Sequence, residues 1–316
     1  MIRGIIMTTV YISGHRNPDT DSICSPLAYS VLKNKLDAPQ KYEAIRLGNI
    51  SNETKFILDY FKVEAPMFVK DIEAGQKLIL VDHNEFVQAV EGIENADLLE
   101  IVDHHKVNFS WPNPIYVRTE TTGCSATIIT KMFRENGIEI DVQTAGLLMS
   151  AILSDSLLFK SPTCTPEDEK ICRELAVIAG VENVEAYGLE MLKAGTTLLG
   201  KTVEEIFNVD FKDFVEGNVK YGVSQVNTMD IDGFVQSSKF DMLAYMNKLT
   251  EKGGYDFLLL LLTDIIKEGS LLISTGNVGI VESAFGIELE DAVKYVPGIL
   301  SRKKQVIPVI TRKIQS

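Results

Sequence analysis

Residues 14–22 of the chain read Gly14-His15-Arg16-Asn17-Pro18-Asp19-Thr20-Asp21-Ser22. An apolar run of strand length, residues 9–13, precedes this segment, and a helix-like pattern, residues 23–35, follows it. The segment is therefore predicted to be the loop of a strand–loop–helix unit, in which Pro18 fixes φ and removes a hydrogen-bond donor. His15, Asp19 and Asp21 offer one imidazole and two carboxylates, and such groups bind divalent cations.

The alternation of strand and helix continues outward from this loop. Strand-length apolar runs occupy residues 42–47, 78–81 and 98–102, and residues 52–61 have a helical pattern. The chain then becomes mostly helical from residue 124 to residue 191, notably at 144–153 and 166–180. Strands that alternate with helices predict an α/β fold with βαβ units and a mainly parallel sheet. In such sheets the functional site lies outside the carboxyl ends of the strands.

Three further polar motifs follow apolar runs. Asp82-His83-Asn84 and Asp103-His104-His105 each end a predicted strand, and Ser154-Asp155-Ser156 ends a helix-like run. These motifs are expected to meet the first loop at one edge of the sheet. Oxygen and nitrogen ligands without sulfur favour Mn²⁺, Mg²⁺ or Co²⁺ over a structural zinc site. More than four candidate ligands indicate two cations, which is the usual arrangement for phosphoryl hydrolysis.

The pattern changes near residue 200. Helices are predicted at 203–207 and 237–249, and strands at 219–226, 257–262, 271–275 and 306–310. The sequence thus predicts a metal-binding domain at residues 1–194, a linker or hinge at 195–200 and a smaller α/β domain at 201–316. The active site is expected in the cleft between the two domains, with the region of Gly195 as the hinge.

Composition and charge exclude several classes of protein. The 316 residues are 45% apolar and 24% charged, which is typical of a globular protein and not of a disordered or membrane protein. A net charge of −13 makes nucleic acid and anionic lipid poor partners. The last 16 residues nevertheless carry five bases and no acid, which indicates a local anion site.

The termini and the cysteines predict a cytoplasmic protein. Residues 1–13 lack the pattern of a secretory signal, and the first residues are interpreted as a short leader before the first strand. The longest apolar run in the second half, residues 257–262, is too short to cross a membrane. Reduced, mostly buried thiols are expected at the four cysteines, because their spacing fits neither zinc nor redox motifs: Cys24, Cys124, Cys164 and Cys172.

The motifs, taken in order, resemble those of a known enzyme family. H-x-N-P-D-T-D-S, D-H-N, D-H-H, S-D-S and S-R-K-K-Q, the last at residues 301–305, are similar to the family II, manganese-dependent inorganic pyrophosphatases of the DHH phosphoesterase superfamily. The resemblance covers both domains, a DHH domain and a C-terminal DHHA2-type domain, without an inserted regulatory CBS pair. It implies hydrolysis of inorganic diphosphate to two orthophosphates, by a hydroxide that bridges two metal ions. It also implies a homodimer.

The resemblance also implies roles for individual residues. His15 and Asp19 would ligate the first metal, Asp21, His104 and Asp155 the second, and Asp82 both. His105 would face the substrate, while His83 and Asp103 would orient neighbouring ligands. Three cations of the C-terminal domain would bind phosphate oxygens: Lys212, Arg302 and Lys303. The cofactors would be two Mn²⁺ per subunit, with Co²⁺ or Mg²⁺ as alternatives, and additional Mg²⁺ would arrive with the pyrophosphate.

Other functions stay open beside this one. An exopolyphosphatase of the same superfamily would share the metal ligands, but it needs a longer basic channel than the small cluster seen here. A DHH-type nuclease or cyclic-dinucleotide phosphodiesterase would need a G-G-G-H motif, and the sequence has no histidine after His105. A metal- or phosphate-sensing module without turnover would be expected to lack a ligand, yet every motif position is filled.

Overall fold

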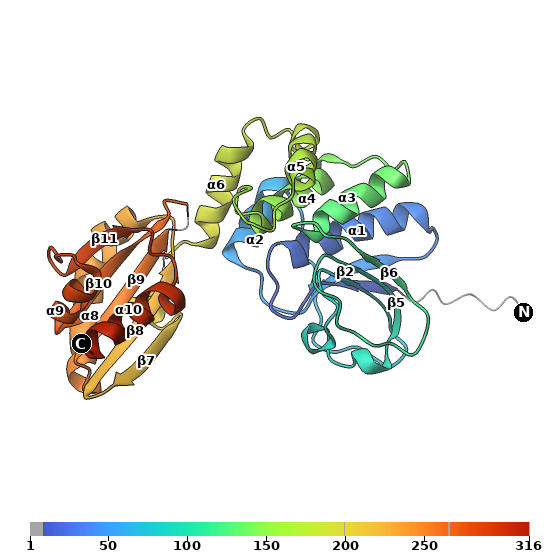
Figure 1. The fold of residues 1–316 in the computed structure, drawn as a ribbon. Coiled ribbons are helices and arrows are strands. Elements are labelled where there is room, and N and C mark those ends of the chain that lie inside the picture. The colour runs from blue at the N-terminus through green and yellow to red at the C-terminus, as the bar shows by residue number, and fades with distance from the viewer. Residues whose placement is uncertain (1–8, 199, 265, 316) are drawn as a thin grey trace, which may run out of the picture. The chain divides into compact units, whose positions relative to one another are not determined.

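Six parallel strands form the sheet of the first half of the chain, in the order β3-β2-β1-β4-β5-β6 (Figure 1). The computed structural model describes residues 9–198, 200–264 and 266–315, so the leader predicted before residue 9 lies outside the described residues. The strands are β1 (Val10–Ser13), β2 (Tyr42–Arg46), β3 (Met67–Phe68), β4 (Lys77–Val81), β5 (Asp97–Asp103) and β6 (Tyr116–Thr119). The predicted α/β class with a mainly parallel sheet is confirmed.

The strand order explains where a site can form. The chain runs outward from β1 to β3 and then returns to the other side of β1 with β4, so the direction of winding reverses between β1 and β4. Loops that leave two such strands diverge and open a crevice at the carboxyl edge of the sheet. The next strand, β5, pairs with β4. The three histidine-containing motifs therefore emerge from three neighbouring strands.

Helices lie on one side of this sheet, as Figure 1 shows: α1 contacts β1 and β2, and α3 contacts β5, while α4 and α5 pack against these helices. Short 3₁₀ turns and the loop that contains Trp111 cover Leu78, Leu80 and Ile101. Helix α4 is apolar along almost its whole length because it is buried between other helices. The helices of this unit are α1 (Asp21–Leu36), α2 (Asn52–Phe61), α3 (Ser125–Glu135), α4 (Val142–Asp155), α5 (Pro166–Ala179) and α6 (Val184–Gly195).

A second compact unit begins at Thr196 and has its own core. Its five-stranded sheet has the order β11-β10-β9-β8-β7, in which only β8 and β9 are parallel. All eight residues of the central strand β9 are buried. The strands are β7 (Phe211–Glu216), β8 (Val219–Asn227), β9 (Phe257–Asp264), β10 (Gly269–Gly276) and β11 (Val293–Pro297).

Helices cover both faces of the second sheet. Leu258, Leu260 and Leu262 of β9 face a core cluster that includes residues of α7 (Val203–Phe207) and α8 (Ile231–Gly253). Leu259 and Leu261 face the opposite cluster, to which α9 (Val278–Phe285) and α10 (Ile307–Gln315) contribute. No helix within the described ranges has both the length and the apolar character that a membrane crossing requires.

One predicted element is wrong. Residues 306–310 were expected as a strand, but they end a π-helical turn (Arg302–Val306) and begin α10. Val306, Ile310 and Ile314 follow a four-residue spacing and pack on the core, which is a helical pattern. Pro308 is the second residue of α10 and directly follows the π-helical turn.

Candidate active site

Asp82 is the centre of a group of acidic and histidine side chains at the carboxyl edge of the first sheet. It directly follows β4, its side chain is 2% exposed, and its φ of 66° is left-handed. Such a backbone costs a non-glycine residue roughly 1–2 kcal/mol, so the surrounding structure must hold it in place. Three overlapping groups around it have the spacing of metal ligands: His15, Asp19 and Asp82; Asp21, His104 and Asp155; and Asp82, His104 and His105.

The first group is built on the loop after β1. Nε2 of His15 lies 3.3 Å from Oδ2 of Asp19 and 3.7 Å from Oδ2 of Asp82. The other carboxylate oxygen of Asp19 accepts a hydrogen bond from the backbone N–H of Ser22 at 3.0 Å. Glycine is required at position 14, because a Cβ there would lie 2.0 Å from the carbonyl oxygen of Ser22. The tight start of the loop therefore directs His15 toward the carboxylates.

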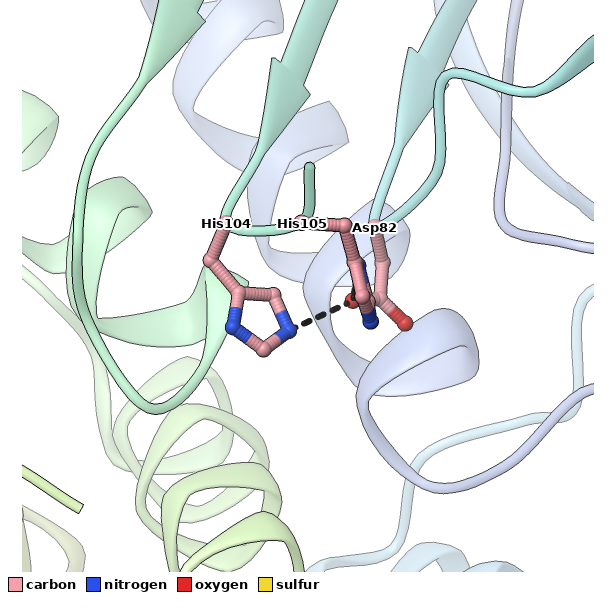
Figure 2. A group of neighbouring side chains, drawn as sticks. All are labelled: Asp82, His104 and His105. Carbon is pink, nitrogen blue, oxygen red and sulfur yellow. Dashed lines mark ion pairs between the residues drawn. The ribbon is translucent and has the colours of Figure 1, made fainter. Parts of the chain in front are cut away.

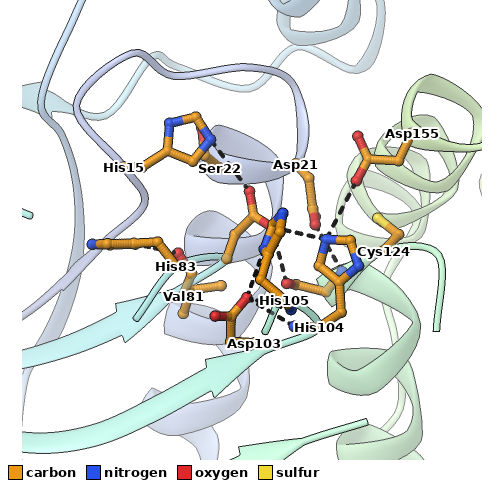
Figure 3. A network of polar contacts seen from close by, with 12 residues as sticks. His15, Asp21, Ser22, Val81, His83, Asp103, His104, His105, Cys124 and Asp155 are labelled. Atoms are coloured by element: carbon orange, nitrogen blue, oxygen red, sulfur yellow. Dashed lines mark hydrogen bonds and ion pairs between the residues drawn. The ribbon is translucent and has the colours of Figure 1, made fainter. Parts of the chain in front are cut away.

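The second group depends on the tautomer of His104. Nδ1 of His104 lies 3.1 Å from the carbonyl oxygen of Thr122, which can only accept, so Nδ1 carries the hydrogen. The lone pair of Nε2 therefore faces Oδ1 of Asp82 at 3.3 Å and Oδ2 of Asp155 at 3.9 Å (Figures 2 and 3). An imidazole held by a carbonyl in this way is the usual support for a metal-ligating histidine.

Asp21 completes the second group and is held by two serines. Oδ2 of Asp21 accepts the backbone N–H of Ser125 at 2.7 Å, and its Oδ1 accepts the hydroxyl of Ser25. The Ser125 hydroxyl in turn donates to Oδ1 of Asp82 at 3.2 Å. Ser125 is the first residue of α3, so the N-terminus of that helix faces two of the carboxylates. The sequence reasoning missed Ser125, because a serine at a helix start has no pattern of its own.

The carboxylates repel one another when no cation lies among them. Burial and the charges of Asp21 and Asp19 raise the pKa of Asp82 well above its usual value. Burial and Asp21 likewise raise the pKa of Asp155. Burial also opposes the ionisation of Asp19, but hydrogen bonds from His15 and Ser22 lower its pKa overall. Four carboxylates and two imidazoles gathered in this way fit divalent cations.

His105 lies beside the group and is more open to solvent. Its side chain is 54% exposed, and its Nδ1 lies 2.9 Å from Oδ1 of the fully buried Asp103. This hydrogen bond is the largest cause of the raised pKa of His105. The second oxygen of Asp103 accepts a hydrogen bond from Nδ2 of Asn84 at 2.5 Å. Asp103 thus fixes the orientation of His105, and Nε2 of that ring remains available for a ligand.

His83 lies in the same region but is buried. Its Nδ1 lies 3.0 Å from the carbonyl oxygen of Val81, and burial lowers the pKa of the ring to about 4. A cavity of about 220 Å³ opens here, and its lining includes His15, Asp82, His105 and Lys106. Lys106 is a cation at the site that the motif analysis did not single out.

The three cations predicted to bind phosphate belong to the second unit and differ in exposure. Lys212, on β7, and Lys303 are exposed. Arg302 is buried, with Nη1 donating to the carbonyl oxygens of Asp210 and Val223, and Nη2 lying 2.9 Å from Oδ1 of Asp210. Val223 is the register partner of Lys212, so Arg302 and Lys212 lie at the same end of the β7–β8 pair.

The turn that carries Arg302 and Lys303 is held by two glutamines. Oε1 of Gln225 accepts the backbone N–H of Arg302 at 2.9 Å, while Oε1 of Gln305 accepts those of Leu300 and Ser301. The sequence reasoning included Gln305 in its motif but missed Gln225 and gave no role to Asp210. Only the fold shows that β7 and β8 pass beside this turn.

Comparisons with known proteins agree with this arrangement of two units. A family model described as "DHH family, N-terminal domain" matches residues 9–152, and a model described as "DHHA2 domain" matches residues 189–313. A relative from Clostridium acetobutylicum, named "Probable manganese-dependent inorganic pyrophosphatase", is 55% identical over 310 residues, which are 97% of this chain and 98% of that protein. A Bacillus cereus relative of the same name is 47% identical and covers 98% of this chain and all of its own length.

A solved structure is also similar over both units. It is the crystal structure of a Methanococcus jannaschii protein classed with the family II inorganic pyrophosphatases. The TM-score is 0.61 at 39% sequence identity, and the match covers 97% of this chain and 99% of the other.

Proposed function

Since the chain belongs to the family of manganese-dependent inorganic pyrophosphatases, we propose that it hydrolyses inorganic diphosphate to two orthophosphates. The observation that carries the proposal is the position of Asp82. One of its oxygens faces His15 at 3.7 Å, and the other faces His104 at 3.3 Å. A carboxylate whose two oxygens point to two separate ligand groups is suited to bridge two cations.

The ligands divide between two Mn²⁺ ions around this bridge. His15 and Asp19 would hold one ion, Asp21, His104 and Asp155 would hold the other, and Asp82 would contact both. When bound, the ions supply the Lewis-acid chemistry of two-metal phosphoryl hydrolases. The chain contributes the preset geometry, since the hydrogen bonds of His104, Asp21 and Asp19 already direct their lone pairs into the site.

His105 is proposed as the proton donor toward the leaving phosphate. Its Nδ1 hydrogen is held by Asp103, so a proton can be delivered only from Nε2. The hydrogen bond to Asp103, the largest cause of the raised pKa of the ring, favours the protonated form that a proton donor requires. The exposure of the side chain leaves Nε2 accessible to a phosphate oxygen.

The charge of the substrate requires cations from elsewhere. The four aspartates balance two divalent cations, so diphosphate must be neutralised by other groups. We assign this role to Lys212, Lys303, the Arg302 N–H groups not used by Asp210 and Val223, and additional Mg²⁺ that arrives with the substrate. In this proposal residues 1–194 bind the metals, residues 201–316 bind the substrate, and residues 195–200, of which residue 199 lies outside the described residues, act as a hinge.

We further propose that the protein works in the cytoplasm as a homodimer. The edge strand β6 of the first sheet exposes Tyr116 and Val117, which are 49% and 40% accessible. An edge strand with apolar side chains is a natural surface for pairing with a second copy. A Tyr116→Lys variant that remains dimeric in sedimentation measurements would contradict this interface.

The activity is tested by phosphate release from metal-free protein supplied with Mn²⁺ and Mg²⁺. Rapid release from diphosphate and slow release from long-chain polyphosphate is the expected result. Preference for the polymer would favour an exopolyphosphatase. Release from neither substrate, by folded protein that binds two Mn²⁺, would indicate a sensor without turnover and overturn the proposal.

A further inference from the structure

One carboxylate outside the ligand set connects two of the metal-binding segments. Oε1 of Glu53, in the first turn of α2, accepts the hydroxyl of Thr20 at 2.7 Å and the hydroxyl of Ser154 at 2.5 Å. Thr20 lies between Asp19 and Asp21, and Ser154 directly precedes Asp155. A single oxygen atom therefore joins the loop after β1 to the end of α4, two segments that are far apart in the sequence.

The hydrogen bonds of the neighbouring hydroxyl groups hold this connection in place. Oγ1 of the buried Thr54 lies 3.2 Å from Oγ1 of Thr20 and 2.9 Å from Oγ of Ser51. Ser51 is the N-cap of α2 and accepts the backbone N–H of Thr54 at 3.1 Å. Within the described residues Glu53 has no lysine or arginine partner, so its contacts are those to the metal-binding segments and not an ion pair.

Gly195 limits the space around the same carboxylate. A Cβ at this position would lie 2.8 Å from the Cβ of Glu53 and 2.8 Å from its Oε2. The Cβ of Glu53 cannot move without shifting α2, so a side chain at position 195 must displace the carboxylate or the helix. Gly195 ends α6, which packs against α2, and it is the last residue of the first unit. The chain therefore leaves this unit directly over Glu53.

We propose that Glu53 is a positioning residue, which holds the Asp19–Asp21 loop and the Asp155 end of α4 at the separation that two cations require. Gly195 is glycine because a side chain there would displace Glu53. The inference rests on the proposed two-metal function of the site. It adds that a change at Gly195, where the chain leaves the first unit, alters the affinity for the metals through the side chain of Glu53.

The test is a double-mutant cycle read as Mn²⁺ affinity. Metal-free full-length protein is titrated with Mn²⁺, and the free ion is followed by electron paramagnetic resonance. Glu53→Ala should weaken Mn²⁺ binding by about 10–100-fold, as expected for loss of a group that orients ligands. Glu53→Gln retains an acceptor oxygen and should therefore lose less of the Mn²⁺ affinity than Glu53→Ala. Gly195→Ala should also weaken binding, but in the Glu53→Ala background its further effect should be within about twofold.

The control is Glu64→Gln, which removes the same charge from an exposed position of the same unit. Its Mn²⁺ affinity should equal that of the parent protein. If Glu53→Ala does not fold, as judged by thermal unfolding of the metal-free form, Glu53→Gln alone is compared with the parent protein. Unchanged affinity in the Glu53 variants, or an equal effect of Gly195→Ala in both backgrounds, overturns the inference. Because the readout is metal binding, an absence of diphosphate hydrolysis would contradict the proposed function and leave this result interpretable.

Discussion

Oδ1 of Asp103 lies 2.9 Å from Nδ1 of His105, and the same oxygen accepts the backbone N–H groups of His104 and His105 at 2.8 and 3.1 Å. One buried carboxylate oxygen thus fixes the turn that carries both histidines. It sets the orientation of the His105 ring, which is the proposed proton donor, and the backbone of His104, which is a proposed metal ligand.

We expect Asp103→Asn to lower the pKa of His105, because the largest cause of its elevation is the hydrogen bond to this carboxylate. A histidine with a lower pKa loses its proton at lower pH, so the alkaline loss of kcat should shift to lower pH. Proton NMR of the imidazole signals, assigned with His105→Gln, measures the pKa directly. A His105 pKa that is the same in both proteins would contradict the role of Asp103.

Removal of the metal should make the stability depend on pH in a predictable direction. The pKa values of Asp82 and Asp155 are raised in the folded, metal-free protein, so the folded state binds more protons than the unfolded state. Stability should therefore fall as pH rises through these raised values. Bound Mn²⁺ removes the repulsion, so the Tm gained on adding Mn²⁺ should be larger near pH 8 than near pH 5. A gain that decreases with pH would contradict the assignment.

The buried His83 contributes to this pH dependence with the opposite sign. The pKa of His83, about 4, lies below the value in the unfolded chain. This histidine therefore lowers the free energy of unfolding as pH falls from about 6.5 toward 4. The Mn²⁺-loaded and metal-free forms share this contribution. It therefore largely cancels when the two Tm values are subtracted at each pH.

Asp82→Asn should separate folding from metal binding. Asparagine tolerates the left-handed backbone at this position, so the fold should be retained. Loss of the bridging charge should reduce turnover by about 100-fold or more. The Tm of the metal-free variant should exceed that of the parent near pH 8, because a buried, repelled charge is gone. Two Mn²⁺ bound at parental affinity with normal turnover would exclude Asp82 as the bridge.

Lys303→Met should raise KM for diphosphate by about tenfold, the effect of losing one charge-assisted hydrogen bond, and leave Mn²⁺ affinity unchanged. Lys304→Met is the matched control, because this neighbouring lysine is also exposed and carries the same charge. Steady-state kinetics and a Mn²⁺ titration of both variants provide the comparison. Equal changes in KM for the two variants would indicate a general charge effect in place of a specific contact.

The first sheet could be predicted because several segments of the sequence repeat the same pattern. Each of β1, β4 and β5 is a short apolar run that ends at a polar motif, and parallel pairing alone brings such ends together. The end of the chain was not predictable in the same way. The run Val306-Ile307-Pro308-Val309-Ile310 has the length and β-branched composition of a strand, and only packing against β9 selects the helix.

The supporting contacts could not be predicted from the sequence. Ser125 acts on Asp21 through its backbone N–H, which any residue except proline would supply at that helix start. The acceptors of the Arg302 guanidinium are mainly backbone carbonyls of Asp210 and Val223, whose positions depend on the β7–β8 pair. Such contacts depend on where the backbone passes, and residue types alone do not specify this.

The central strand β9 has a consequence for how the protein is synthesised. Residues 257–263 carry no charge, and one face of the strand is covered by Val306 and Ile310 of the last segment. The ribosome makes this strand before that segment, so an apolar, β-forming run lacks its cover on this face until the last segment has also emerged. A chain that terminates before residue 306 leaves this face of β9 uncovered and should therefore aggregate into inclusion bodies. Chaperones and proteases would have to remove it.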